Sequence, residues 1–128
     1  MYDANVPSLL SMPYLGYCKK EDTLYQHTRS FILSHHNPYY YQGTCASGIG
    51  SPYTPKNYIR HIALSMQGLT GTKEEAKKMI NLILETSNNE GLCHEGFNKD
   101  EPSEYTRFWF AWANSLFAEL VYQTYFVK

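Results

Sequence analysis

The sequence predicts an all-α fold, on two observations. Apolar side chains recur at helical spacing in several segments, and residues that favour helix starts precede them. No segment shows the sustained alternation of apolar and polar residues that is typical of a strand. The 128 residues fit one domain, and a chain of this length can bury a sizeable core. We therefore expect one helical domain with about five helices.

Two helices are expected before residue 34. The first covers residues 6–17, with Asn5 as its N-cap, and Pro13 ends or kinks it. The second follows Asp22, which can cap it, and runs to about residue 33.

Three more helices are expected after residue 56, over residues 57–69, 72–86 and 105–126. Thr72 and Glu75 have the spacing of a capping box at the start of the second of these. The last helix is apolar on nearly every side, as helices buried among others are. Trp109 and Trp112 share one of its faces, and core packing is the expected role of at least one of them. Five helices are too few to bury such a helix, so part of the fold is expected to be missing.

Two long connections, residues 34–56 and 87–104, separate these helices. Connections of more than about 12–15 residues without secondary structure are uncommon and often functional; a poorly ordered insertion is the alternative. The first of them contains three consecutive tyrosines at 39–41, and aromatic residues make up 16% of the chain. Tyrosine and tryptophan offer a flat apolar face with a polar edge, which suits sugar rings.

The composition argues against several functional classes. The net charge of −1 gives no basic footprint for nucleic acid, and no apolar run reaches the roughly 18–20 residues that span a bilayer. The cysteines, Cys18, Cys45 and Cys93, are isolated, and no CxxC pair or phosphate-binding fingerprint occurs. We expect no metal, no cofactor, no nucleic-acid partner and no membrane partner. The lack of a basic and apolar leader predicts a cytoplasmic location.

The pair His94-Glu95 is the main candidate for chemistry, in a glycine-flanked loop. A loop carboxylate beside a histidine can act as a general base; a solvated loop charge is the alternative. Asn98 stands where a zinc metalloprotease needs its second histidine, which excludes that class.

Two further polar sites lie at expected helix starts. Asp3 and Asn5 precede the first helix, where they can recognise hydroxyl groups or only cap the helix. Arg107 lies at the start of the last helix, where the helix dipole disfavours a cation. An arginine held there often pairs with a carboxylate, and Glu95 is a candidate partner.

Several segments in the same order resemble glycoside hydrolase family 125, the metal-independent exo-α-mannosidases. They are residues 3–17, 31–34 with 37–41, 48–52, 62–70, 94–95 and 109–121. The resemblance implies an (α/α)6 toroid of helices that hydrolyses non-reducing terminal α-1,6-linked mannose with inversion, using two carboxylates and no metal. The implied substrate is a mannose-containing oligosaccharide or N-glycan.

The resemblance also assigns roles. Glu95 matches the family's general base, whereas the family's general acid, an aspartate, lies before residue 1. Residues 1–128 then correspond to the C-terminal portion of a single (α/α)6 catalytic domain, which is expected to be inactive alone and to have the missing N-terminal portion as a partner. The substrate-binding residues that we expect are Asp3, Asn5, Ser51, Tyr53, His94, Arg107 and Trp109.

This sequence departs from the family pattern near these residues. A histidine is usual where Tyr53 stands, Trp-Pro where Arg60 and His61 stand, and serine where Gly96 stands. Tyr53 would replace an imidazole that could bind a hydroxyl group, and Arg60-His61 puts charge where an aromatic wall would lie. Gly96 is expected to loosen the loop of the base. His61, on a helix, is expected to be structural.

Three readings of function remain open. The first is a mannosidase fragment with Glu95 as base, the second a module that binds mannosides without cleaving them, and the third a pseudogene remnant. Because helices in a toroid pack against neighbours on both sides, a partial ring is expected to expose apolar stripes and to aggregate or form oligomers.

Overall fold

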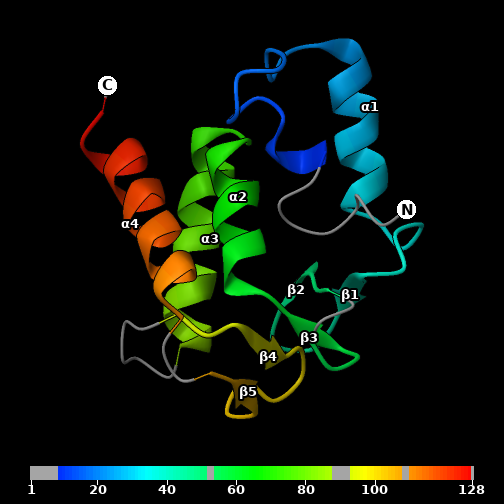
Figure 1. Cartoon of the computed structure of the whole chain (residues 1–128), viewed down its shortest axis with the longest axis vertical. Helices are drawn as coiled ribbons and strands as arrows, with labels where there is room; N and C mark the ends of the chain where they lie inside the picture. Colours follow the sequence, from blue (N-terminus) through cyan, green and yellow to red (C-terminus); the bar gives the residue numbers. More distant parts are fainter. Residues whose placement is uncertain (1–8, 52–53, 88–92, 108–109, 128) are drawn as a thin grey trace.

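The computed structural model describes residues 9–51, 54–87, 93–107 and 110–127. Three helices, α2 (His61–Leu69), α3 (Lys73–Thr86) and α4 (Ala111–Tyr125), lie side by side, and α1 (Thr23–Ile32) stands apart from them (Figure 1). A short 3-10 helix, η2 (Leu9–Ser11), precedes α1. The frame is helical, with the strands gathered at the end where α2 and α4 begin.

The prediction of an all-α fold is wrong, because five short strands form two antiparallel sheets. Strand β1 (Tyr40–Gln42) pairs with β2 (Ser47–Ile49). Strand β4 (Gly96–Asn98) lies between β3 (Tyr58–Ile59) and β5 (Tyr105–Thr106). Strands of two or three residues are too short to show the alternation that marks a strand in sequence. The described parts of the two long connections therefore contain strands, with β1 and β2 in the first connection and β4 in the second.

The helix predicted at residues 6–17 does not form over its described part. After η2 the chain continues as turns through residue 16, with hydrogen bonds such as Leu15 N–H to Ser11 O and Tyr17 N–H to Met12 O. Residues 6–8 and the predicted cap Asn5 lie outside the described residues.

Helices α1 and α3 begin where their capping residues predict. Asp22 accepts a hydrogen bond from the Tyr25 N–H, and Thr72 accepts one from the Glu75 N–H. The Glu75 carboxylate does not complete a capping box, since it binds Arg29 on α1 instead. Helix α3 buries the stripe formed by Ala76, Met79, Ile80 and Ile83.

Helix α2 starts four residues later than the pattern suggests and forms the centre of the core. Asn57 has a positive φ of 70°, which a helix does not allow, and the next residues pair with β4. Helix α2 then packs against both α3 and α4. A Cβ on Gly68 would lie 2.8 Å from Leu120 Cδ1, so a larger residue at this position would displace the Leu120 side chain of α4.

Helix α4 also starts later than predicted and is buried on only one stripe, formed by Ala113, Leu116, Leu120 and Thr124. Residues 105–106 belong to β5, and the helix begins only at Ala111. Large apolar side chains of its other face are exposed, with Trp112 at 50%, Tyr122 at 56% and Tyr125 at 54%. Contacts within the described part of the chain therefore leave much of the apolar surface of α4 exposed to solvent.

Candidate active site

Glu95 lies directly before β4, the central strand of the three-stranded sheet. Its backbone N–H donates to Thr106 O on β5 at 3.1 Å. Strand β3, which pairs with the other edge of β4, leads straight into α2. The residue before Glu95, His94, donates its backbone N–H to the ring of His61, the first residue of α2, so Glu95 lies close to the start of that helix.

The predicted pairing of Glu95 with Arg107 is confirmed, with Nε and Oε1 3.6 Å apart. The Glu95 side chain is 22% exposed and that of Arg107 65% exposed, so the carboxylate is partly shielded and its cation faces solvent. Arg107 does not begin a helix, however. It follows β5 with a positive φ of 52°, a backbone conformation that costs energy for any residue with a side chain.

A second arginine lies on the same side of Glu95. The guanidinium carbons of Arg60 and Arg107 stand 5.9 and 5.7 Å from the centre of the Phe110 ring, within the range of a cation–π contact. Arg60 is 7% exposed. Burial lowers the pKa of Arg60, and the nearby charge of Glu95 opposes that shift. The two cations that interact with the charge of Glu95 thus pack against the same aromatic ring.

His94 contributes a buried ring rather than an exposed one. It is 1% exposed and stacks on Tyr105, with ring centroids 3.9 Å apart and planes at 5°. On its other side the His61 ring lies at 5.4 Å. In the described structure these contacts hold the ring that precedes Glu95.

His61, the first residue of α2, makes two hydrogen bonds with its ring. Its Nδ1 accepts from the His94 backbone N–H at 2.9 Å, and its Nε2 lies 2.8 Å from Thr86 Oγ1 at the end of α3. Burial lowers the pKa of His61 to about 3, and the neighbouring His94 adds to the shift. The arginine-histidine pair at 60–61 therefore places one buried cation and one neutral ring next to the candidate base.

Ser51 is connected to strand β4 indirectly, because Thr54 bonds to Ser51 and packs beside Gly96 of that strand. The N–H and hydroxyl of Thr54 donate to Ser51 O at 3.4 and 3.3 Å. A Cβ on Gly96 would lie 3.3 Å from Thr54 Cγ2, so Gly96 sits tightly in β4 against Thr54. We expected Gly96 to loosen the loop of the base, but the residue lies in a strand and packs closely against Thr54. Ser51 itself is 2% exposed.

Four predicted site residues, Asp3, Asn5, Tyr53 and Trp109, lie outside the described residues. Of the other four, Arg107 pairs with Glu95 and His94 directly precedes it, whereas Ser51 accepts its hydrogen bonds from Thr54. In the part of the chain that it describes, no group of three or more His, Cys, Asp and Glu side chains could hold a metal ion. Nor does that part contain a helix with the length and hydropathy to cross a bilayer.

Sequence reasoning missed three supports of the site, Asn114, Cys93 and Phe110. Asn114 accepts a hydrogen bond from the Cys93 N–H and donates one to Phe110 O. Burial raises the pKa of the Cys93 thiol to about 12, so that thiol stays protonated. A polar residue in the first turn of a mostly apolar helix was the one available signal for Asn114.

The family model described as "Metal-independent alpha-mannosidase (GH125)" matches residues 1–122. A curated relative, the Meiotically up-regulated gene 157 protein of Schizosaccharomyces pombe, is 43% identical over 123 residues. That alignment covers 94% of this chain and 24% of the relative.

A solved structure from Streptococcus pneumoniae superposes with a TM-score of 0.92 at 51% identity. It is described as a non-productive substrate complex with α-1,6-mannobiose, from a family of metal-independent α-mannosidases that bears on N-linked glycan processing. The match covers 97% of this chain and 29% of that one. This chain thus spans 24% of the length of the S. pombe relative and 29% of the S. pneumoniae chain.

Proposed function

The chain belongs to glycoside hydrolase family 125, the metal-independent α-mannosidases, and we propose that it forms the C-terminal portion of an (α/α)6 catalytic domain. The proposed reaction is inverting hydrolysis of non-reducing terminal α-1,6-linked mannose. The proposed substrates are mannose-containing oligosaccharides or N-glycans. The observation that supports this most is the partly exposed Glu95 carboxylate, which pairs with Arg107 and lies near the charge of Arg60.

Glu95 is proposed as the general base. In an inverting glycosidase the base takes a proton from a water molecule, which attacks the sugar from the face opposite the leaving group. This requires a carboxylate that is both fixed and reachable by water. Glu95 meets both conditions, because its backbone is bonded to β5 while 22% of its side chain is exposed.

The general acid is proposed to come from the share of the domain that this chain does not cover. An inverting pair needs a second carboxyl group about 6.5–9.5 Å from the base, with room for the water between them. Loss of such acid–base assistance typically costs ~10²–10⁴ in rate. We therefore expect the 128 residues alone to hydrolyse mannosides at most very slowly.

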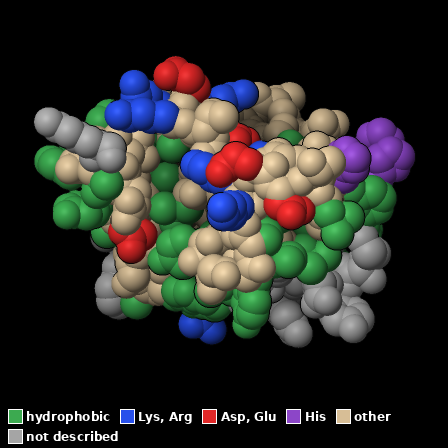
Figure 2. All heavy atoms as spheres, turned by 90° about the horizontal axis from the view of Figure 1, so that it is seen from above, with side chains coloured by type: hydrophobic (Ala, Val, Ile, Leu, Met, Phe, Trp, Pro, Cys, Tyr) green, Lys and Arg blue, Asp and Glu red, His purple; other side chains and the backbone are tan. Residues whose placement is uncertain are grey.

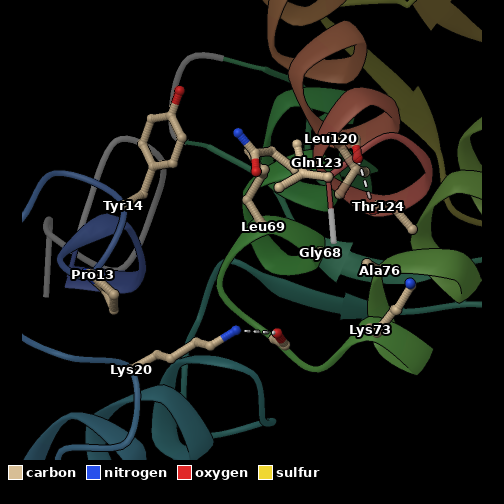
Figure 3. Close-up of a pocket in the computed structure, with 12 residues that line it drawn as sticks. Pro13, Tyr14, Lys20, Gly68, Leu69, Lys73, Ala76, Leu120, Gln123 and Thr124 are labelled. Carbon is tan, nitrogen blue, oxygen red and sulfur yellow. Dashed lines mark hydrogen bonds between the residues drawn. The ribbon is translucent and has the colours of Figure 1, made fainter.

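The exposed face of α4 supports this proposal. Apolar side chains gather beside the C-terminal end of α4, at the left edge of Figure 2, where Tyr122, Tyr125 and Phe126 are 54–73% exposed. Next to them, a pocket of about 460 Å³ opens between α2, α4 and the turn that carries Tyr14 (Figure 3). We propose that the rest of the domain covers this surface, and that the chain alone self-associates through it.

The remaining predicted residues take substrate-binding roles in this proposal. We propose that the sugar contacts Asp3, Asn5, Tyr53 and Trp109. The segments that carry Ser51 and Arg107 are proposed to take part in the same substrate site. His94 is proposed to line the site through the stack described above. The mannobiose complex of the S. pneumoniae relative supports a mannoside as the ligand class.

The test starts with the genomic DNA immediately upstream of the Met1 codon. An in-frame continuation that encodes further helices should give, when expressed with this chain, a protein that releases mannose from α-1,6-mannobiose. Glu95→Gln should abolish that release, and Glu104→Gln, an exposed carboxylate of the same sheet region, should not. Mannose release by residues 1–128 alone would contradict the proposal of a missing acid. Binding of mannobiose without hydrolysis, unchanged by Glu95→Gln, would favour a non-catalytic binding module.

A further inference from the structure

The backbone N–H groups of Cys93, His94 and Glu95 donate hydrogen bonds to three different elements of the fold. The Cys93 N–H donates to Asn114 on α4 at 3.1 Å, and the Glu95 N–H donates to Thr106 O on β5 at 3.1 Å. Between them, the His94 N–H donates to the His61 ring on α2 at 2.9 Å. The backbone before Glu95 is thus fixed residue by residue, and one of its three anchors is a buried imidazole.

The hydrogen bonds of Thr86 determine which nitrogen of His61 carries the proton. The Thr86 hydroxyl has one hydrogen, which it donates to Leu82 O at 2.8 Å. Towards His61 the same oxygen can only accept, so Nε2 of His61 must be the protonated nitrogen. Nδ1 then has a free lone pair, which is what the His94 N–H needs. Both ends of the ring therefore require the same neutral tautomer.

The surroundings of His61 also favour that neutral form. The residue is 0% exposed, its ring lies 4.6 Å from that of Phe97, and the one neighbouring imidazole, His94, packs at 5.4 Å. A charged imidazolium would be desolvated there and would lose its acceptor for the His94 N–H. This agrees with the lowering of the His61 pKa by burial.

We propose that His61 is a positioning residue for Glu95, acting as a fixed hydrogen-bond acceptor that holds the preceding peptide against the last turn of α3. The role rests on the proposed function, in which Glu95 is the base. Catalytic groups must be held within about 0.5 Å of their productive place, and a misplacement of about 1 Å can cost 10²-fold in rate. His61 supplies that restraint through the backbone, without touching the substrate.

Three readouts on the chain of residues 1–128 test this without any hydrolysis. The first is the ¹⁵N shift of the His61 ring in the unaltered chain, which should show Nδ1 unprotonated and Nε2 protonated. The second is the hydrogen-exchange rate of the His94 amide. The third is the Arg107 Nε–H signal, which reports the ion pair with Glu95 and is calibrated by Glu95→Gln. Because none of them needs mannosidase activity, failure of the proposed function is seen separately, in the mannobiose assay.

Two substitutions separate positioning from packing. His61→Phe keeps a ring in the stack and removes both nitrogens, and it should speed exchange of the His94 amide at least tenfold and move the Arg107 signal towards its Glu95→Gln position. His61→Asn places an acceptor oxygen close to the site of Nδ1, and it should restore both readouts towards those of the unaltered chain.

Three results would overturn the proposal. A proton on Nδ1 would remove the acceptor, and this measurement does not depend on any variant folding. An Arg107 signal left unchanged by a folded His61→Phe chain would mean that Glu95 is not positioned through His61. Equal effects of His61→Asn and His61→Phe would assign His61 a packing role only.

Discussion

The side-chain carbonyl of Asn114, on the first turn of α4, accepts a hydrogen bond of 3.1 Å from the backbone N–H of Cys93, two residues before Glu95. The amide group of the same side chain donates to Phe110 O at 2.9 Å. Phe110 in turn donates its N–H to Cys93 O at 2.9 Å. One side chain therefore joins the start of α4 to the segment that carries the candidate base.

Asn114→Ala should lower the free energy of unfolding by about 1–3 kcal/mol, because it leaves the part-buried Cys93 N–H without its acceptor. Urea unfolding followed by far-UV circular dichroism measures the change. Gln123→Ala, on the exposed side of the same helix, removes only a surface hydrogen bond to Glu119 and should change stability by no more than about 0.5 kcal/mol. Equal losses in the two variants would contradict the role given to Asn114.

Arg107 is one of two non-glycine residues with a positive φ in the described part of the chain. Arg107→Ala and Arg107→Gly both delete the ion pair with Glu95, but only glycine adopts this backbone without strain. The glycine variant should therefore be more stable than the alanine variant by about 1 kcal/mol. The same urea titration on both proteins measures the difference. If alanine proved as stable as glycine, the backbone at 107 would not be strained.

The ion pair between Arg29 and Glu75, at 2.9 Å, lies directly over Gly71. A Cβ at residue 71 would overlap the Glu75 carboxylate, so Gly71→Ala must displace that side chain and break the pair. We expect a loss of about 1–3 kcal/mol in the free energy of unfolding, because both partners are mostly buried. In a Glu75→Ala background the same glycine substitution should cost less than about 0.5 kcal/mol. Additive losses would show that Gly71 is needed for another reason.

The stability of the fold should depend on pH through His61. Its pKa is about 3 in the folded chain and 6.5 ordinarily, so between these values the unfolded chain binds a proton that the folded chain does not. The contribution is fully present above pH 6.5 and is lost as pH falls, by about 1.4 kcal/mol for each pH unit. Urea titrations at pH 7.5, 6.0 and 5.0 should show this slope.

The matching control is the same series on two variants. His61→Phe should remove about 1.4 kcal/mol per pH unit from the slope, whereas His27→Gln, at an exposed position of α1, should leave it as in the unaltered chain. His94 packs against the His61 ring and is present in all three proteins. A slope that survives His61→Phe would assign the acid sensitivity to other groups.

The sequence predicted those elements whose ends depend on nearby residues. Asp22 and Thr72 cap α1 and α3 through their own next turn, and such local signals are visible in a sequence. Ile59, Ile62 and Met66 have the spacing of one helix face, but only the last two belong to α2. Ile59 is buried from β3, because its strand pairs with Phe97 far along the chain. No local pattern reports such a pairing.

The candidate site was predictable in part. Glu95 and Arg107 do form the expected pair, although the argument from a helix start was wrong, since Arg107 follows β5. The supporting roles of Asn114 and His61 depend on contacts between separate elements. Residue type and spacing alone do not reveal these contacts.

The way β3 reaches β4 has a consequence for the order in which the chain folds. Ile59 pairs with Phe97 across the whole α2–α3 hairpin, and closing a longer loop costs more chain entropy. The hairpin needs only contacts between neighbouring segments, so it can form before the strands meet. In pulse-labelling hydrogen exchange we expect amides of α2 and α3 to gain protection before the amide of Glu95. A chain arrested at that stage would contain the α2–α3 hairpin but would lack the sheet that holds the backbone of Glu95.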